Sequence, residues 1–270
     1  MRKHPRVLLV CQTIVAMSAA HAQGLLKTYP STATHFTSSI VPAQDGGYVL
    51  AGAHWDPGDA GTLALTKVDP LGDVQWSKRY GPVSKLDRPE VVGLLAGGFL
   101  LLGASNQARD LLLIRVNDLG DTLWTSLYDH PDQCIAKDAI ELANGDFILA
   151  SNTFTAFYLT RINSQGDIVW THGYGGGSVN AATATAPRLD LLLNPDSTVV
   201  LAGTAAYSDA TQTEHVVLKA DLNGTLIWGG FFGDSDEDGL RAIEPTDDGG
   251  YLVMGYHRDN ERDLFAAKLD

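Results

Sequence analysis

The stretch Asp69–Trp76, DPLGDVQW, recurs as NDLGDTLW at 117–124, NSQGDIVW at 163–170 and DLNGTLIW at 221–228. In each copy a glycine precedes the tryptophan by four residues, and an aromatic residue follows the tryptophan by four. The glycines are Gly72, Gly120, Gly166 and Gly224; the tryptophans are Trp76, Trp124, Trp170 and Trp228; the closing rings are Tyr80, Tyr128, Tyr174 and Phe232. Repetition at a spacing of about 50 residues is typical of folds built from stacked or radially arranged units. The repeat is therefore the first guide to the architecture.

Two tight turns punctuate each repeat. One has the form Asp-Gly-Gly or Asn-Gly, as in Asp45–Gly47, which is a strong hairpin signal because these residues tolerate positive φ. The other has Asp or Asn at its first position and Gly at its fourth, as in Asp69–Gly72, which describes a type I turn. Short apolar runs separate the turns, and no long segment after residue 22 has helical periodicity. Each repeat therefore predicts four short antiparallel strands, which form one blade of a β-propeller.

The markers at the start of the second strand count five units, and they are Tyr48, Phe99, Phe147, Val199 and Tyr251. The fifth unit stops at Asp270, where its fourth strand should begin. The segment 25–30, LLKTYP, resembles 76–81, WSKRYG, and Tyr29 precedes Tyr48 by the same 19 residues that separate Tyr80 from Phe99. We predict an all-β, five-bladed propeller of four-stranded antiparallel blades. Residues 23–270 form its single domain, and residues 25–30 close the ring as a strand of the last blade. The alternative is a truncated piece of a longer array.

The first 22 residues are typical of a secretory signal peptide. Arg2, Lys3 and Arg6 precede the mostly apolar run 7–20, and Ala20-His21-Ala22 fits the small-x-small cleavage rule. We expect cleavage near Ala22 and a periplasmic or extracellular location. No other segment is a transmembrane candidate.

Charge and cysteine content exclude several classes of partner. Of the 19 Lys and Arg, 16 remain after cleavage against 32 Asp and Glu, a net charge of −16. Such a surface repels nucleic acid and anionic membranes. Cys134 is the one cysteine of the mature chain, so no internal disulfide is available. We expect a monomer without cofactors, except for the calcium candidate described below.

The repeat resembles the Trp-bearing β-propeller repeats of many secreted bacterial proteins. Their pattern is Asp-Gly-Gly-Tyr, Ala-Gly, Lys-Val-Asp, Gly-x-x-x-Trp and Tyr-Gly, and the likeness covers residues 25–270. Departures are Leu25 in a Trp position, Ser151 in the Ala-Gly position and Val199 in a Tyr position. The resemblance implies the fold and carries no catalytic residues with it.

Loops that vary between repeats mark the face where binding is expected, because variable loops on a rigid scaffold usually carry function. Trp55 lies outside the repeat register, in a loop with His54 and Asp56, and an exposed ring near acids suits sugar stacking. The alternative is a ring folded onto its own blade. Weaker candidates of the same kind are Tyr207, Tyr256 and His257.

The loop 234–239, DSDEDG, is a candidate calcium site. Asp234, Asp236 and Asp238 have the spacing that supplies carboxylate oxygens to calcium. Position twelve of such a loop should be a bidentate acid but is Pro245. The alternative is a solvated acidic loop between blades. A basic residue recurs at one third-strand position of all five repeats: Lys67, Arg115, Arg161, Lys219 and Lys268. It is interpreted as a structural ion-pair partner or a snorkelling side chain, and the tryptophans as packing between blades.

Three functions stay open, because a propeller fold does not fix activity. The leading hypothesis is a secreted, non-enzymatic module that binds or scaffolds a glycan or protein through the variable-loop face. The alternatives are a structural surface domain without ligand and a glycoside-active enzyme that uses loop carboxylates. Buried acids with raised pKa in the central funnel would favour the enzyme.

Overall fold

The computed structural model describes residues 27–29, 34–55, 61–83, 89–105, 110–129, 135–152, 156–175, 179–181, 189–207, 213–232, 239–258 and 262–270. The chain divides into two compact units, Met1–Pro30 and Ser31–Asp270. Over the described ranges the regular structure is entirely β, and none of it is a helix that could cross a membrane. The prediction of an all-β fold without helices is therefore confirmed for this part of the chain.

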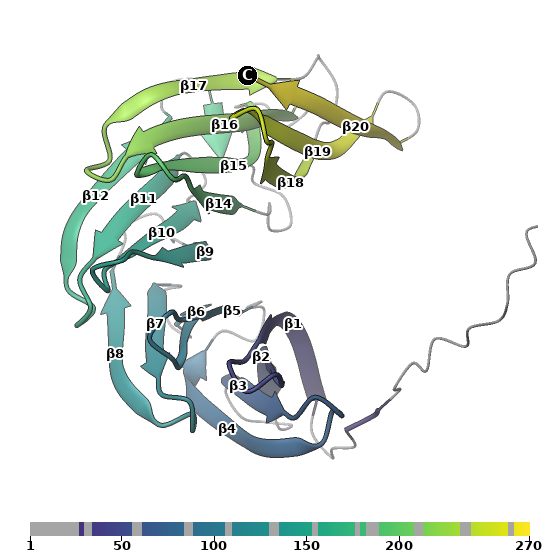
Figure 1. Cartoon of the computed structure of the whole chain (residues 1–270), viewed down its shortest axis with the longest axis vertical. Helices are drawn as coiled ribbons and strands as arrows, with labels where there is room; N and C mark the ends of the chain where they lie inside the picture. Colours follow the sequence, from purple (N-terminus) through teal and green to yellow (C-terminus); the bar gives the residue numbers. More distant parts are fainter. Residues whose placement is uncertain are drawn as a thin grey trace, which may run out of the picture. The chain divides into compact units, whose positions relative to one another are not determined.

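Five antiparallel sheets follow one another in chain order within the second unit (Figure 1). Sheet 1 contains β1 (Thr34–Pro42), β2 (Tyr48–Trp55), β3 (Gly61–Val68) and β4 (Val74–Val83). Sheet 2 contains β5 (Glu90–Gly93), β6 (Phe99–Ala104), β7 (Leu111–Val116) and β8 (Thr122–Tyr128). Sheet 3 contains β9 (Ile135–Glu141), β10 (Phe147–Asn152), β11 (Phe157–Ile162) and β12 (Ile168–Tyr174). Sheet 4 contains β14 (Asp190–Leu193), β15 (Thr198–Tyr207), β16 (Thr213–Asp221) and β17 (Leu226–Phe232), with β13 (Val179–Ala181) paired to the end of β15. Sheet 5 contains β18 (Gly239–Pro245), β19 (Tyr251–Arg258) and β20 (Arg262–Leu269).

The turn between the third and fourth strands has the type I geometry that the sequence predicts. In sheet 1 the Gly72 amide donates to the Asp69 carbonyl at 2.9 Å. The Asp69 side chain accepts from the amides of Leu71 and Asp73 at 2.9 and 2.8 Å. Gly72 has φ +75°, a conformation that costs an L-residue about 1–2 kcal/mol. The Asp and the Gly of the repeat are therefore local requirements of the turn.

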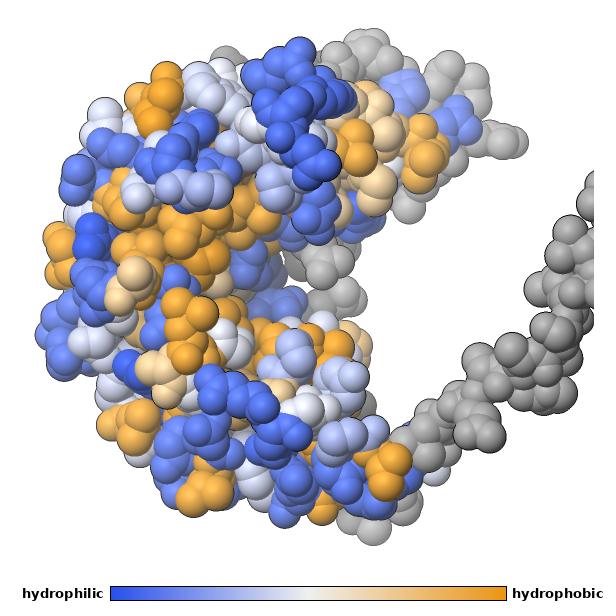
Figure 2. Space-filling model, viewed as in Figure 1, coloured by the Kyte–Doolittle hydropathy of each residue, from blue (hydrophilic) through white to orange (hydrophobic). Residues whose placement is uncertain are grey.

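Second and third strands of sheets 2, 3 and 4 are mostly buried on both faces, which explains why their sequences are apolar at both parities. In sheet 5, by contrast, Leu252 and Met254 of β19 are 39% and 43% exposed. In sheet 2, Leu101 and Ile114 pack toward sheet 1, whereas Leu100 and Leu113 pack toward sheet 3. Equivalent clusters join sheet 3 to sheet 4 and sheet 4 to sheet 5. On the side in view in Figure 2, hydrophobic residues are interspersed with hydrophilic ones and do not form one continuous apolar face. The core is thus a series of layers between neighbouring sheets.

The repeated tryptophan and tyrosine donate hydrogen bonds to backbone carbonyls of the next sheet. The Trp124 indole N–H donates to the Ser164 carbonyl at 2.9 Å, and the Tyr128 hydroxyl donates to the Gly166 carbonyl at 2.5 Å. A Cβ on Gly166 would lie 3.1 Å from the indole, so the close approach also requires glycine there. The same contacts join Trp76 and Tyr80 to Asp118 and Gly120, and Trp170 and Tyr174 to Leu222 and Gly224.

The recurring basic residue pairs with an acid of the first hairpin turn in four sheets. The N–O distances are 2.6 Å for Lys67–Asp45, 2.7 Å for Arg161–Asp146, 3.1 Å for Lys219–Asp196 and 2.5 Å for Lys268–Asp248. Sheet 2 has Ala96 at the turn position, and there Arg115 instead donates to the Ser164 carbonyl at 3.4 Å and lies 5.7 Å from the centre of the Phe147 ring. The interpretation of these cations as structural ion-pair partners is therefore confirmed for four of the five.

Sheet 5 has three strands in the part of the chain that the structure describes. Residues 27–29 do not form a strand in the first unit. Five sheets agree with the predicted five units, whereas closure of the ring by residues 25–30 stays a prediction.

Candidate functional site

The first strands of successive sheets lie side by side. β1 contacts β5, β5 contacts β9, β9 contacts β14, and β14 contacts β18 (Figure 1). Each first strand begins at the variable-loop end of its sheet and runs toward the first hairpin turn. Residues at equivalent positions of neighbouring first strands are therefore brought close to one another.

Three carboxylates occupy one register position on three consecutive first strands. Glu90 lies opposite Leu102, Asp138 opposite Ala150, and Asp190 opposite Ala202. Each partner is the fourth residue of its sheet's second strand when counted from the repeat markers Phe99, Phe147 and Val199. Sheets 1 and 5 have Ser39 and Ala242 at this position. The acids are therefore aligned by topology, although they are about 50 residues apart in sequence.

Asp138 is at the centre of this group. Burial raises the pKa of its carboxyl most, the amides of Leu191 and Ala139 oppose the rise, and the negative charges of Asp190 and Glu90 add to it, so the pKa changes from 3.8 to about 7. One carboxylate oxygen accepts from the Leu191 amide at 2.8 Å and the other from the Ala139 amide at 2.8 Å. Near pH 7 the group can hold or release a proton, as a general acid or base must.

Hydrogen bonds from first-strand side chains to backbone amides of the next sheet also hold neighbouring sheets in register. The Leu191 amide belongs to β14, so its bond to Asp138 joins sheet 4 to sheet 3. At the same register position in sheet 1, Ser39 accepts from the Val91 amide of sheet 2 at 3.4 Å. The backbone amides of Leu191 and Ala139 consequently fix the position of the Asp138 carboxylate, so it is pre-organised by the fold.

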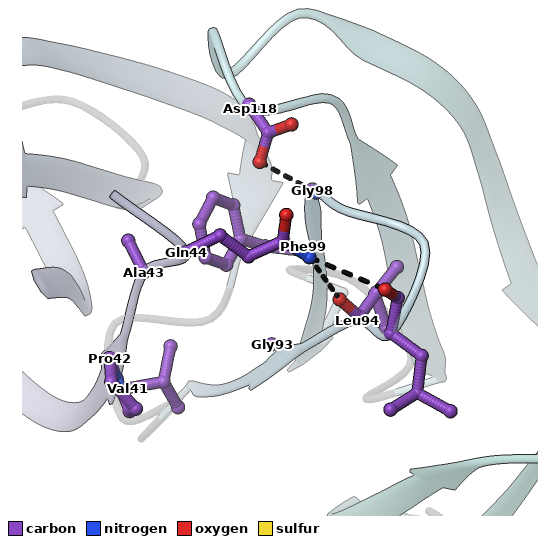
Figure 3. Close-up of a pocket in the computed structure, with 10 residues that line it drawn as sticks. Val41, Pro42, Ala43, Gln44, Gly93, Leu94, Gly98, Phe99 and Asp118 are labelled. Carbon is purple, nitrogen blue, oxygen red and sulfur yellow. Dashed lines mark hydrogen bonds between the residues drawn. The ribbon is translucent and has the colours of Figure 1, made fainter. Parts of the chain in front are cut away.

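A pocket of about 350 Å³ lies at the opposite, turn end of sheets 1 and 2 (Figure 3). Its walls are formed by turn residues such as Ala43 and Leu94. The Gln44 amide donates to the carbonyls of Leu94 and Leu95 at 3.5 and 3.3 Å, and Asp118 accepts from the Gly98 amide at 2.9 Å. Hydrogen bonds within the protein therefore already engage the polar side chains of this pocket. It is a weaker candidate for a functional site than the three aligned carboxylates Glu90, Asp138 and Asp190.

The sequence-predicted binding residues that the structure describes lie on three sheets. His54 and Trp55 end β2; His54 is 1% exposed, and Trp55 is half-buried. Tyr256 and His257 lie near the end of β19 and are half-buried. Tyr207 ends β15, and Asp56 lies outside the described residues. The burial of His54 removes it as a surface contact, while sugar stacking on Trp55 stays a prediction.

The candidate calcium residues Asp234, Asp236 and Asp238 lie outside the described residues, so the calcium site stays a prediction. Within the described ranges no group of three or more His, Cys, Asp or Glu side chains could hold a metal ion.

Our sequence reasoning missed Glu90, Asp138 and Asp190. A signal for them exists, because each lies nine residues before the marker that starts the second strand of its sheet. Acids at one repeat position in only three of five units are easily taken for scattered surface charge. The shared repeat position of the three acids indicates a site only once the first strands of neighbouring sheets are known to contact one another.

No protein-family model and no curated protein sequence matches the chain. Solved structures do match it. An ulvan lyase of polysaccharide lyase family 25 has a TM-score of 0.59 at 9% identity, over 85% of this chain and 66% of that one. BBS1N, in complex with ARL6DN, has a TM-score of 0.53 at 13% identity, over 90% and 68%. An exo-beta-1,3-galactanase from Phanerochaete chrysosporium has a TM-score of 0.50 at 10% identity, over 86% and 60%.

This chain has the β-propeller fold. It spans less than two thirds of the length of the two enzymes that it resembles. The sequence-based hypothesis of a non-enzymatic binding module is corrected by these comparisons, because a galactanase and a polysaccharide lyase are among the proteins that share the fold. The aligned acids Glu90, Asp138 and Asp190 lie on first strands, whereas the sequence-based glycoside-active alternative expected loop carboxylates.

Proposed function

We propose that this protein is an exported glycan-cleaving enzyme that hydrolyses glycosidic bonds with carboxylates of its first strands. The observation that carries the proposal is the alignment of Glu90, Asp138 and Asp190 at one register position, with the pKa of Asp138 raised to about 7. Two carboxyl groups of opposite protonation are what glycoside hydrolysis requires. The likeness in fold to polysaccharide-cleaving enzymes adds support.

In the proposed reaction Asp138 is the general acid. Its proton passes to the glycosidic oxygen as the bond to the anomeric carbon breaks. Glu90 or Asp190, ionised, takes a proton from the attacking water, and the water oxygen forms the new bond to the anomeric carbon. The negative charges of these two neighbours favour the protonated form of Asp138, so the same contacts that tune its pKa assign the roles.

A panel of polysaccharides, with β-1,3-galactan included, tests this activity by the release of reducing ends. Asp138→Asn should lower kcat by at least a hundredfold, since general acid catalysis contributes about 10²–10⁴. Glu141→Gln, on the same strand but at its turn end, is the matched control and should keep full activity. Wild-type kcat should fall as pH rises through about 7, where Asp138 loses its proton. Release of no reducing ends from any polysaccharide, or an Asp138→Asn variant as active as wild type, would refute the proposal.

We also propose that residues 1–22 direct export and that residues 25–30 supply the fourth strand of sheet 5. Support comes from the hydrogen bonds that join other sheets. The Tyr80 hydroxyl donates to the Gly120 carbonyl at 2.7 Å, and the Tyr174 hydroxyl donates to the Gly224 carbonyl at 2.6 Å. Tyr29 has the same spacing to its second-strand marker as Tyr80. Tyr29→Phe should then lower the melting temperature as much as Tyr80→Phe does; an unchanged melting temperature would argue against closure.

A further inference from the structure

Three of the first strands carry a β-bulge at one register position. The pairing shifts between Thr37 and Ser39 in β1, between Asp138 and Ala136 in β9, and between Leu240 and Ala242 in β18. The extra residues are Ser38, Lys137 and Arg241. A bulge redirects its extra side chain away from the regular alternation of the strand. These three side chains are therefore placed separately from the alternating core residues, next to the carboxylate register.

Two of the three bulged residues are cations. Lys137 immediately precedes Asp138, and Arg241 precedes Ala242, the residue that aligns with the carboxylates. The third residue, Ser38, donates to the Pro89 carbonyl just before Glu90. Lys137 is half-buried and Arg241 is exposed. In a chain with a net charge of −13, these two cations partly offset the negative charge of the three acids at this register.

An aromatic platform orients Arg241. Its guanidinium lies 5.1 Å from the centre of the Tyr256 ring, in a cation–π contact. The ring in turn covers Gly239, where an added Cβ would lie 2.3 Å from a ring carbon. The absence of a side chain at Gly239 thus makes room for the Tyr256 ring beside β18, and this ring contacts Arg241. A guanidinium over an aromatic ring can direct its fork of N–H donors to a carboxylate or sulfate.

We infer that Arg241 and Lys137 form a subsite for an anionic substituent of the glycan, a uronate carboxylate or a sulfate ester. β9 and β18 lie on either side of β14, so the two cations flank the strand that carries Asp190. An acidic sugar held there would place its glycosidic bond beside the carboxylates, and a neutral sugar would lack this contact. The inference rests on the proposed function for the position of the bond, but the binding of anionic glycan can be measured without any cleavage.

Calorimetric titration with oligogalacturonate and with a neutral galacto-oligosaccharide of equal length tests the subsite. Wild type should bind the acidic oligosaccharide at least tenfold more tightly than the neutral one. Arg241→Ala and Lys137→Ala should each weaken binding of the acidic ligand about tenfold and leave the neutral ligand unchanged, since a hydrogen bond to a charged group contributes about that factor. Arg241→Lys should restore part of the loss. Arg79→Ala, on the outer strand β4, is the matched control and should have no effect.

Equal affinity for the two oligosaccharides, or acidic binding that survives the Arg241→Ala and Lys137→Ala changes in folded protein, would overturn the inference. If either of these binding results is found while polysaccharide is still cleaved in an Asp138-dependent manner, the proposed function stands and only the subsite fails. If no polysaccharide is cleaved but the acidic oligosaccharide binds through Arg241, the subsite stands and the hydrolase proposal fails.

Discussion

The pKa of Asp138 makes a quantitative prediction about stability. The carboxyl has a pKa of about 7 in the folded chain and 3.8 as an ordinary carboxyl, so the folded protein binds the proton more tightly than the unfolded chain. Between these values folding takes up a proton, and the free energy of unfolding must fall as pH rises. A difference of about three units corresponds to about 4 kcal/mol at 1.36 kcal/mol per unit. This loss of free energy of unfolding is absent below pH 4 and complete above pH 7.

The variant Asp138→Asn isolates this effect, because it removes the titration and keeps the shape. Replacing one oxygen by an amide puts a donor against the amide of Leu191 or Ala139, at a pH-independent cost of about 1–3 kcal/mol. The free energy of unfolding of the variant minus that of wild type should therefore rise by about 4 kcal/mol from pH 4 to pH 8.

Urea unfolding of both proteins at half-unit pH steps measures the difference, and circular dichroism at each pH checks that both start folded. Other carboxylates cancel because they are common to the two proteins. A difference that stays constant over this range would show that Asp138 titrates normally, and the general acid assignment would fail with it.

Four further substitutions test the turns and contacts of the repeat. Gly224→Ala should destabilise the fold by about 3 kcal/mol, because φ is +80° and the new Cβ would lie 2.5 Å from a neighbouring imidazole carbon; Gly249→Ala, with φ +88° and open space, should cost only about 1 kcal/mol. Equal losses in chemical denaturation would mean that the turn conformation alone requires glycine. Asp146→Ala should cost about 2 kcal/mol by leaving the half-buried Arg161 guanidinium without its carboxylate, and a melting temperature equal to that of wild type would count against a structural ion pair. Tyr128→Phe removes one bond to the next sheet and should cost about 1 kcal/mol, to be measured in the same unfolding assay.

Local rules account for the parts of the fold that were predicted. Asp69 and Gly72 dictate their turn within four residues, and the apolar runs of the second and third strands of sheets 2, 3 and 4 report burial on both faces. Because each unit can bury these faces only against a neighbour, repetition of the pattern was enough to predict successive four-stranded sheets.

The candidate site depended on contacts that no local pattern records. Glu90, Asp138 and Asp190 are remote in sequence, and only the meeting of first strands brings their charges within reach of one another. The sequence by itself determined the repeating unit, because turn geometry and burial act over a few residues. Only the tertiary structure decided which acids share a register, which cations are redirected by bulges and which carboxyl holds its proton, because burial and electrostatic coupling arise when separate strands are packed together.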